Sequence, residues 1–406
     1  MNDLTISQAV TLKEGNITTP KGFLAHGLHC GVRGENKDLA LIWCETKATA
    51  AGMFTTNQVK APPVLVCQEM LADGEAQGVI INSGNANACT GEQGMKDAWE
   101  MAELTAALMG VSIDDVLVCS TGLIGRVLPM DKLRAGIPQL KAGLSVEGGK
   151  LACEAIMTTD AFPKTQAAEV RTAYGNFLIG GMAKGAGMIH PQLATTLGFL
   201  STDAEIGSEL LSKALKQAMD SSFNCITVDG DTSTNDTVLV LASGKSGVKI
   251  EENNGYAEFV EGLTRVAQSL AKMVVKDGEG ARRMVELQVI NGPTEAAAKQ
   301  VAETIAGSLL FKTMLVGGEP NWGRVVAAAG RSGVTIQPHL LKLWFGGVQV
   351  VENGLGLEGN LAEAAAMLQA PEVKIVLDLA DGDCEATVWT CDINENYVVL
   401  NGSYMT

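Results

Sequence analysis

The residues best suited to covalent chemistry lie in the segment from Lys184 to Asp203, which reads KGAGMIHPQLATTLGFLSTD. Glycines and a proline lead to Ala194 and Thr195, and an apolar stretch follows. A threonine that starts a strand after a glycine-rich approach is typical of an N-terminal nucleophile. Cleavage of the Ala194–Thr195 bond would free an α-amine whose pKa of ~8 lets it act as the base for the Thr195 hydroxyl. One residue would then supply nucleophile and base for acyl transfer, although the spacing alone also fits an ordinary strand threonine.

Two further segments carry polar residues in places that need an explanation. Glu279 lies in KDGEGARR at the end of a long predicted helix, and helix C-termini disfavour anions. A solvated acid beside Arg282 and Arg283 is the alternative to a binding role for this carboxylate. The run NSGNANACTG (82–91) follows an apolar strand and fits either a site or a tight network of turns.

Motifs for other chemistries are weak or missing from the sequence. GLGLEG (354–359) has the spacing of a dinucleotide fingerprint but does not open a βαβ unit, so it predicts a turn and a helix cap. GEPNWGR (318–324) has Arg324 where a P-loop has its lysine, and it predicts a turn around Trp322. The four histidines are scattered and no GxSxG elbow occurs, so we expect neither a metal site nor a serine hydrolase. The nine cysteines form no CxxC pair and are expected to be buried, reduced thiols.

The composition argues against several classes of protein. The 406 residues carry a formal net charge of -16, and 46% of them are hydrophobic. An acidic chain repels phosphate backbones, so we expect no nucleic-acid partner. Charged residues interrupt every apolar run before it reaches membrane-spanning length, and no signal peptide pattern opens the chain, so we expect a cytoplasmic protein with no membrane partner. The 46 glycines indicate places where the backbone passes close to another group.

The elements that must position the candidate residues alternate between strands and helices, which is typical of an α/β fold. The apolar strand in DDVLVCSTGLIG runs into a turn at Thr121 and Gly122, and YAEFVEGLTRVAQSLAKMVVKDGEG predicts an amphipathic helix that ends at Gly278. FNCITVDGDTSTNDTVLVLASG predicts a pair of strands around a small polar run, and the chain is expected to end in a strand. We expect a change of domain near residue 284, between an N-terminal lobe (1–283) that holds the cleavage site and a C-terminal α/β lobe (284–406).

Eight motifs spread along the chain point to one family. They are KGAGMIHPQLATTLGFLSTD, NSGNANACTG, CSTGLIG, AIMTTDAFPK, TVDGDTSTND, KDGEGA, NWGR and the C-terminal NGSYMT. With PKGFLAHGLHCG (20–31) they make the chain resemble, from Pro20 to Thr406, the ornithine acetyltransferase family of arginine biosynthesis, also called the ArgJ or glutamate N-acetyltransferase family. The resemblance implies a mixed α/β, two-lobed, self-cleaving fold with layered sheets and helices and an N-terminal nucleophile.

The resemblance also implies an activity and a subunit composition. The precursor would cleave itself before Thr195 into an α chain (1–194) and a β chain (195–406), two of each forming a heterotetramer. Thr195 would take the acetyl group from N2-acetyl-L-ornithine and pass it to L-glutamate in a ping-pong transfer. No cofactor is expected, and acetyl-CoA is an optional second acetyl donor of the bifunctional members.

The resemblance assigns roles to individual residues. Thr121 and Gly122 match the oxyanion hole, whose donors stabilise the tetrahedral intermediate. The substrate-binding positions match Thr158, Lys184, Thr195, Glu279, Asn401 and Thr406. Thr159 competes with Thr158 for its position. Lys184 and Asn401 suit the α-carboxylates of the substrates, and Glu279 suits the δ-ammonium of ornithine.

Two other functions stay open on the residues alone. A self-processing aminopeptidase or amidase would use the same nucleophile with water as the acceptor. A glycine-rich protein that binds a nucleotide at GLGLEG would have no enzymatic activity.

Overall fold

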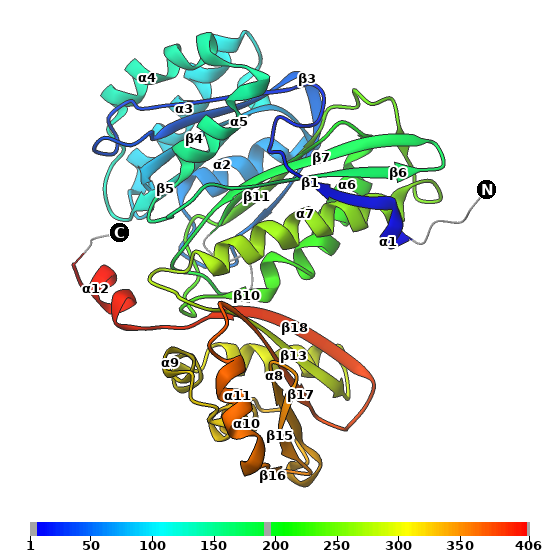
Figure 1. The fold of residues 1–406 in the computed structure, drawn as a ribbon. Coiled ribbons are helices and arrows are strands. Elements are labelled where there is room, and N and C mark those ends of the chain that lie inside the picture. The colour runs from blue at the N-terminus through cyan, green and yellow to red at the C-terminus, as the bar shows by residue number, and fades with distance from the viewer. Residues whose placement is uncertain (1–5, 191–195, 404–406) are drawn as a thin grey trace.

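The computed structural model describes residues 6–190 and 196–403, which fold into two β-sheets covered by helices and a further two-stranded sheet (Figure 1). The predicted mixed α/β class is therefore confirmed. Ala194, Thr195 and Thr406 lie outside the described residues.

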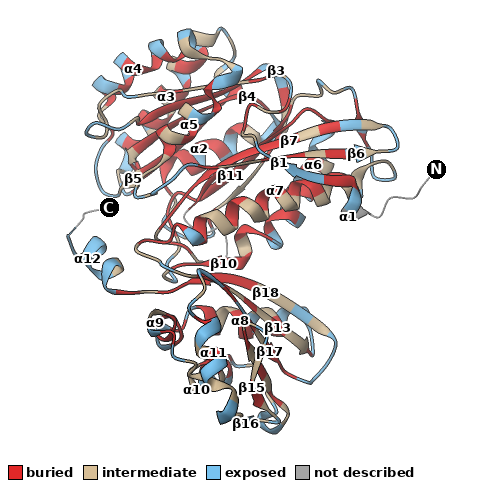
Figure 2. Ribbon diagram, viewed as in Figure 1, coloured by how far each residue is buried: buried red, intermediate tan, exposed pale blue. Residues whose placement is uncertain are grey.

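The larger sheet holds nine strands in the order β1-β6-β7-β8-β11-β3-β4-β5, with β2 paired to β3. Its strands are β1 (Val10–Lys13), β2 (Phe23–Leu28), β3 (Leu39–Phe54), β4 (Glu75–Asn85), β5 (Val116–Leu123), β6 (Lys164–Thr172), β7 (Gly175–Lys184), β8 (Leu197–Thr202) and β11 (Thr237–Ala242). The central strands β8 and β11 are buried along their whole length, because helices cover both faces of the sheet (Figure 2).

Alternating side chains of this sheet enter two separate cores. On β11, Leu239 and Leu241 pack into one core, whereas Val238 and Val240 pack into the other. One core is closed by α2 (Pro62–Met70), α3 (Gly91–Met109), α4 (Met130–Gly143) and α5 (Gly149–Ile156). The other is closed by α6 (Ser208–Asp220) and α7 (Tyr256–Lys276). The short α1 (Ile6–Ala9) precedes β1.

The long helix α7 confirms the predicted amphipathic helix. Its buried residues include Phe259, Leu263, Val266 and Leu270, which recur every three or four positions along one face. The helix ends at Lys276 with Asp277 as its C-cap, so Glu279 comes three residues after the last helical residue.

The smaller sheet has the order β10-β18-β13-β17-β14-β15-β16. Its strands are β10 (Ile226–Thr227), β13 (Met284–Gly292), β14 (Lys342–Phe345), β15 (Val348–Glu352), β16 (Leu355–Gly356), β17 (Glu372–Asp378) and β18 (Cys384–Cys391). Helices α8 (Glu295–Ala306), α9 (Leu309–Gly317), α10 (Trp322–Gly330) and α11 (Leu361–Met367) accompany it. A third core, whose buried members run from Val285 to Val388, lies within this lobe. The strands β9 (Glu205–Ile206) and β12 (Lys249–Ile250) form the two-stranded sheet.

Three predicted elements differ in the structure. Glu395–Ser403 forms the helix α12 instead of a final strand, and Asn394 Oδ1 accepts the N–H of Asn396 at its start. Trp322 begins the helix α10 instead of lying in a turn. The two strands around the small polar run exist, but β10 belongs to the smaller sheet and β11 to the larger one.

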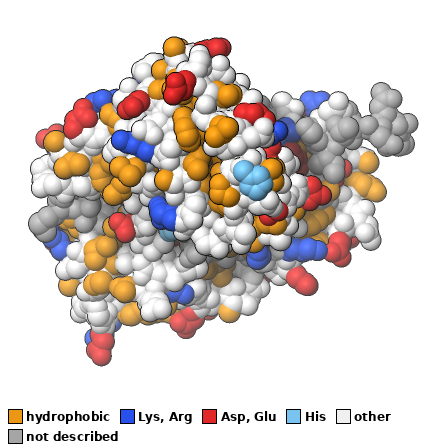
Figure 3. All heavy atoms as spheres, turned by 90° about the horizontal axis from the view of Figure 1, so that it is seen from below, with side chains coloured by type: hydrophobic (Ala, Val, Ile, Leu, Met, Phe, Trp, Pro, Cys, Tyr) orange, Lys and Arg blue, Asp and Glu red, His pale blue; other side chains and the backbone are white. Residues whose placement is uncertain are grey.

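The surface shows how the charge is distributed. On the face seen in Figure 3, acidic, basic and apolar side chains are interspersed. The net charge of -16 is therefore not gathered into one acidic field on that face. None of the described helices is long and apolar enough to cross a membrane.

Candidate active site

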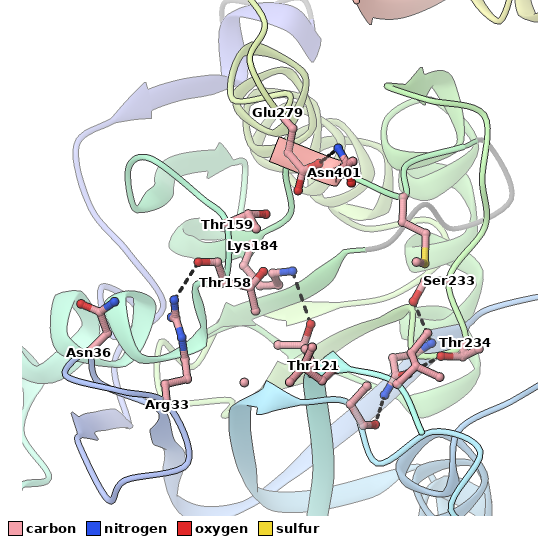
Figure 4. Close-up of a pocket in the computed structure, with 18 of the residues that line it drawn as sticks. Arg33, Asn36, Thr121, Thr158, Thr159, Lys184, Ser233, Thr234, Glu279 and Asn401 are labelled. Carbon is pink, nitrogen blue, oxygen red and sulfur yellow. Dashed lines mark hydrogen bonds between the residues drawn. The ribbon is translucent and has the colours of Figure 1, made fainter. Parts of the chain in front are cut away.

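A cavity of about 530 Å³ lies where strand ends of the larger sheet meet the loop between β10 and β11, the segment after α7, and α12 (Figure 4). Its lining brings together six of the predicted site residues, which are distant in the sequence: Thr121, Gly122, Thr158, Lys184, Glu279 and Asn401. Thr159, the rival of Thr158, lines it too. A cavity of this size suits a small molecule such as an amino-acid derivative.

Thr121 and Gly122 lie at the carboxyl end of β5, which runs parallel to β4. Gly122 has a φ of +130°, and a Cβ built on it would lie 2.4 Å from the carbonyl carbon of Gly84. Only glycine fits this close approach of the two strands. Asn235 fixes the same edge, because its Nδ2 donates to the carbonyl oxygens of Ala86 and Ser120 at 2.6 and 2.9 Å. The main chain at this turn is therefore rigidly held.

Lys184 ends β7 and is buried, with 4% of its surface exposed. Its Nζ donates a hydrogen bond of 3.3 Å to Thr121 Oγ1, and in Figure 4 its side chain points toward that hydroxyl. Burial lowers the pKa of Lys184, while the nearby carboxylates Asp160, Asp236 and Glu279 act in the opposite direction. Because Oγ1 of Thr121 accepts this bond, the hydroxyl hydrogen is left to donate to a group inside the cavity.

Thr158 lies in the loop after α5, and its main chain is held from two sides. Its N–H donates to Asp160 Oδ2 at 2.9 Å, and its carbonyl oxygen accepts from Arg33 Nη2 at 2.8 Å. Arg33 also donates to the carbonyl oxygen of Met157. Arg33 lines the cavity but has no motif around it, and sequence reasoning missed it because its partners lie 124 and 125 residues away.

Glu279 and Asn401 lie together at the far side of the cavity from Thr121 (Figure 4). Asn401 Nδ2 donates to Glu279 Oε2 at 2.7 Å, and the N–H of Glu279 donates to the carbonyl oxygen of Ala186 at 2.8 Å. A Cβ on Gly187 would lie 2.6 Å from the Glu279 carboxyl carbon, so the missing side chain makes room for the carboxylate. Glu279 is thus buried and not the solvated acid that the sequence left open.

A buried ion cluster lies behind the substrate-binding residues. Lys164 Nζ is 2.6 Å from Asp160 Oδ1 and 2.5 Å from Asp277 Oδ2. Burial disfavours the charge of Asp160, but Lys184 and Lys164 outweigh it and lower the pKa of Asp160 to about 2. Asp160 also accepts the N–H groups of Thr158 and Gly185. One carboxylate therefore fixes the segments that carry Thr158 and Lys184.

The loop 228–236 contributes residues to the cavity that the sequence marked only as the motif TVDGDTSTND. Asp229, Asp231, Ser233, Thr234 and Asn235 line the cavity. Because β10 and β11 belong to different sheets, the loop between them crosses from one lobe to the other at the cavity. Its small polar side chains could have been assigned to the site only if the two sheets had been known.

The geometry suits acyl transfer. The Gly122 N–H and the Thr121 hydroxyl at a rigid turn are the kind of donors that stabilise an oxyanion, and a cationic and an anionic side chain lie in the same cavity. The part of the chain that the structure describes contains no group of three or more His, Cys, Asp or Glu that could hold a metal ion.

Comparisons with known proteins identify the family. The model of the ArgJ family matches residues 24–406. The arginine biosynthesis bifunctional protein ArgJ of Symbiobacterium thermophilum is 47% identical over 397 residues, which cover 97% of this chain and 99% of that protein. The protein of the same name from Caldanaerobacter subterraneus is 43% identical over 399 residues, again 97% of this chain and 99% of that protein.

Solved structures include ornithine acetyltransferase complexed with ornithine from Mycobacterium tuberculosis. That structure is 44% identical and covers 45% of this chain and 98% of its own, with a TM-score of 0.42. The family model and both curated relatives extend over almost the whole sequence, so this chain belongs to the ArgJ family.

Proposed function

We propose that this protein is an ornithine acetyltransferase of arginine biosynthesis, which transfers the acetyl group of N2-acetyl-L-ornithine to L-glutamate. The observation that carries the proposal is the single cavity that joins the Thr121–Gly122 turn, Lys184 and Glu279. The ArgJ family has this activity, and relatives over 40% identical bear the name of an arginine biosynthesis enzyme.

The transfer runs in two half-reactions on Thr195. The Thr195 hydroxyl attacks the acetyl carbonyl of N-acetylornithine while its α-amine takes the hydroxyl proton. The Thr121 hydroxyl and the Gly122 N–H donate to the oxyanion that forms. When this intermediate collapses, the C–N bond breaks, the ornithine amine takes the proton, and ornithine leaves acetyl-Thr195 behind. The glutamate amine then attacks the ester, and the reverse proton transfer restores Thr195.

The charges of the cavity match these substrates. The buried carboxylate of Glu279 is suited to the δ-ammonium of ornithine. Asn401 donates from Nδ2 to Glu279 and to the carbonyl oxygen of Tyr397, so in this proposal it orients Glu279 toward the substrate. Lys184 adds positive charge beside the Thr121 hydroxyl, where the oxyanion forms. Thr158 and Thr406 complete the proposed substrate contacts. The cycle needs no cofactor.

Self-cleavage creates the nucleophile in this proposal. The Thr195 hydroxyl attacks the carbonyl carbon of Ala194, the C–N bond between them breaks, and the resulting ester is hydrolysed by water. The products are the α chain (1–194) and the β chain (195–406), and two of each form a heterotetramer in the cytoplasm. Acetyl-CoA is proposed as a second acetyl donor, which an assay with acetyl-CoA and glutamate tests.

The decisive experiment compares two neighbouring threonines. Thr195→Ala is expected to abolish both cleavage and glutamate-dependent transfer from N-acetylornithine. Thr196→Val is the matched control: its Oγ1 is buried and makes no hydrogen bond to a described residue, so replacing the hydroxyl by a methyl should preserve both. The new N-terminus should read Thr-Thr-Leu. An active Thr195→Ala protein would refute the mechanism, and release of acetate without glutamate would indicate a hydrolase instead.

A further inference from the structure

The loop 228–236 holds the main chain on both sides of residues 191–195. Asp229, near its start, binds the segment before them, and Asp236, near its end, binds the residue after them. The proposed cleavage bond, Ala194–Thr195, lies between these two attachment points. These contacts can therefore influence the geometry of self-cleavage as well as the shape of the substrate cavity.

Asp229 uses both carboxylate oxygens on the upstream side. Oδ2 accepts the N–H of Met188 at 2.6 Å, and Oδ1 accepts the N–H of Ile189 at 2.9 Å. The N–H of Val228 donates to the carbonyl oxygen of Ile189 at 2.8 Å. Met188 has a φ of +59°, a left-handed conformation that is uncommon for a residue with a side chain. The hydrogen bonds to Asp229 offset the cost of that conformation.

Asp236 holds the downstream side with one oxygen. Its Oδ1 accepts the N–H of Thr196 at 3.1 Å, and the N–H of Thr237 donates to the carbonyl oxygen of Thr196 at 3.1 Å. Asp236 is 1% exposed, and burial raises its pKa, while hydrogen bonds with Thr196, Ser233 and Thr55 act in the opposite direction. The buried carboxyl of Asp236 therefore fixes the main chain of Thr196, the first described residue after the proposed cleavage bond.

We propose that Asp229 and Asp236 form a clamp that positions the chain for self-cleavage, Asp229 by holding residues 188 and 189 and Asp236 by holding residue 196. This inference rests on the proposed self-cleavage. In self-cleavage the Thr195 hydroxyl must reach the carbonyl carbon of the neighbouring residue, Ala194, and this requires one particular main-chain conformation. A misplacement of ~1 Å between reacting groups can lower the rate on the order of 10²-fold. Both residues are positioning residues, since they act through the main chain.

The full chain is made by cell-free translation, and its cleavage is followed on denaturing gels from the time at which translation is stopped. We expect Asp229→Ala and Asp236→Ala to slow cleavage by about 10²-fold. The matched control is Asp203→Ala. Asp203 follows β8 at its other end, is 1% exposed, and accepts the N–H groups of Leu178 and Lys21 at 2.7 and 3.2 Å. This control should lose thermal stability to a similar extent and still cleave at the wild-type rate.

Isosteric variants separate positioning from folding. Asp236→Asn keeps an oxygen for the Thr196 N–H and should cleave within about 10-fold of wild type. Asp229→Asn must turn an NH₂ group toward Met188 or Ile189, because both oxygens of Asp229 accept N–H groups, and should cleave more slowly than Asp236→Asn.

The outcomes distinguish the clamp from the proposed function. Cleavage of both alanine variants at the rate of Asp203→Ala would overturn the clamp. If the alanine variants do not fold, equal rates for wild type and both asparagine variants would overturn it. A wild-type chain that stays intact while active would instead overturn the proposed self-cleavage.

Discussion

Replacing Lys164 by methionine tests whether the buried ion cluster stabilises the site. The Lys164 side chain is fully buried, and its Nζ contacts one carboxylate oxygen each of Asp160 and Asp277. Methionine fills a similar volume without charge. Lys164→Met therefore leaves two buried carboxylates without their shared cation.

The expected loss can be worked from the contacts. Removing one partner of a buried ion pair costs about 3–5 kcal/mol, because the remaining charge stays desolvated. The pKa of Asp160, about 2 against an ordinary value of 3.8, corresponds to about 2 kcal/mol of stabilisation of its ionised form, to which Lys184 also contributes. We therefore expect Lys164→Met to lower the free energy of unfolding at pH 7 by about 3 kcal/mol or more.

The pH dependence identifies the cause. Because the folded pKa of Asp160 is depressed, its stabilising effect is complete above the unfolded pKa of 3.8 and is lost as the pH falls toward about 2. In Lys164→Met the desolvated carboxyls have raised pKa values, so acidification protonates them in the folded state and relieves the loss. The gap in stability between wild type and variant should narrow from pH 7 to pH 4.

Urea unfolding followed by circular dichroism at several pH values measures this gap. Lys312→Met is the matched control. Lys312 is also fully buried, but its Nζ donates to the neutral oxygens of Thr390 and Cys391 at 2.5 and 2.9 Å. Asp229 and Asp392 act on Lys312 electrostatically without forming a direct ion pair with it, so the loss for Lys312→Met should change less with pH than the loss for Lys164→Met. A loss below about 1 kcal/mol for Lys164→Met, or a gap that does not narrow on acidification, would refute the reasoning.

Three further predictions concern the cavity. Glu279→Gln should raise the KM for N-acetylornithine by about 10–10²-fold, because a charge-assisted hydrogen bond to the substrate is lost. It should slow the acetylation of Thr195 more than the deacetylation by glutamate. Equal effects on the two half-reactions, measured separately, would contradict this. Thr121→Ala should lower kcat by about 10²–10³-fold at nearly constant KM in steady-state assays, since its hydroxyl acts on the transition state. Gly122→Ala should lower both the melting temperature and kcat, because the new Cβ meets Gly84; a melting temperature equal to wild type would show that the strands can separate.

The sequence predicts best the parts of the site that lie on strongly patterned elements. Thr121 and Gly122 follow a continuous apolar strand, and Glu279 follows a helix with a clear apolar stripe, so their places at element ends were visible in the sequence. The resemblance added Lys184, Thr158 and Asn401, and the structure brings all of them to one cavity. The roles of these residues stay predictions until the variants are measured.

The residues that sequence reasoning missed depend on contacts far apart in the chain. Arg33 reaches Thr158 across 125 positions, and no local pattern marks it. The strand β10 has only two residues, too few for any periodicity, so its sheet could not be inferred and the loop 228–236 could not be placed. In α12 the β-branched pair Val398 and Val399 favours a strand by propensity, but both are exposed on a helix outside the sheets.

The glycines explain why the site can be rigid and close-packed at once. At Gly122 and at Gly187 a Cβ would lie less than 3 Å from the atoms of Gly84 and Glu279 respectively. At Gly122 the ends of two strands thus approach each other more closely than a side chain would allow, and at Gly187 the loop approaches the Glu279 carboxylate in the same way. The oxyanion donors then need no rearrangement when charge develops, because hydrogen bonds from Asn235 hold the carbonyl groups beside them. Substitutions that loosen this edge should therefore act on kcat more than on substrate affinity, since a preorganised donor acts mainly on the transition state.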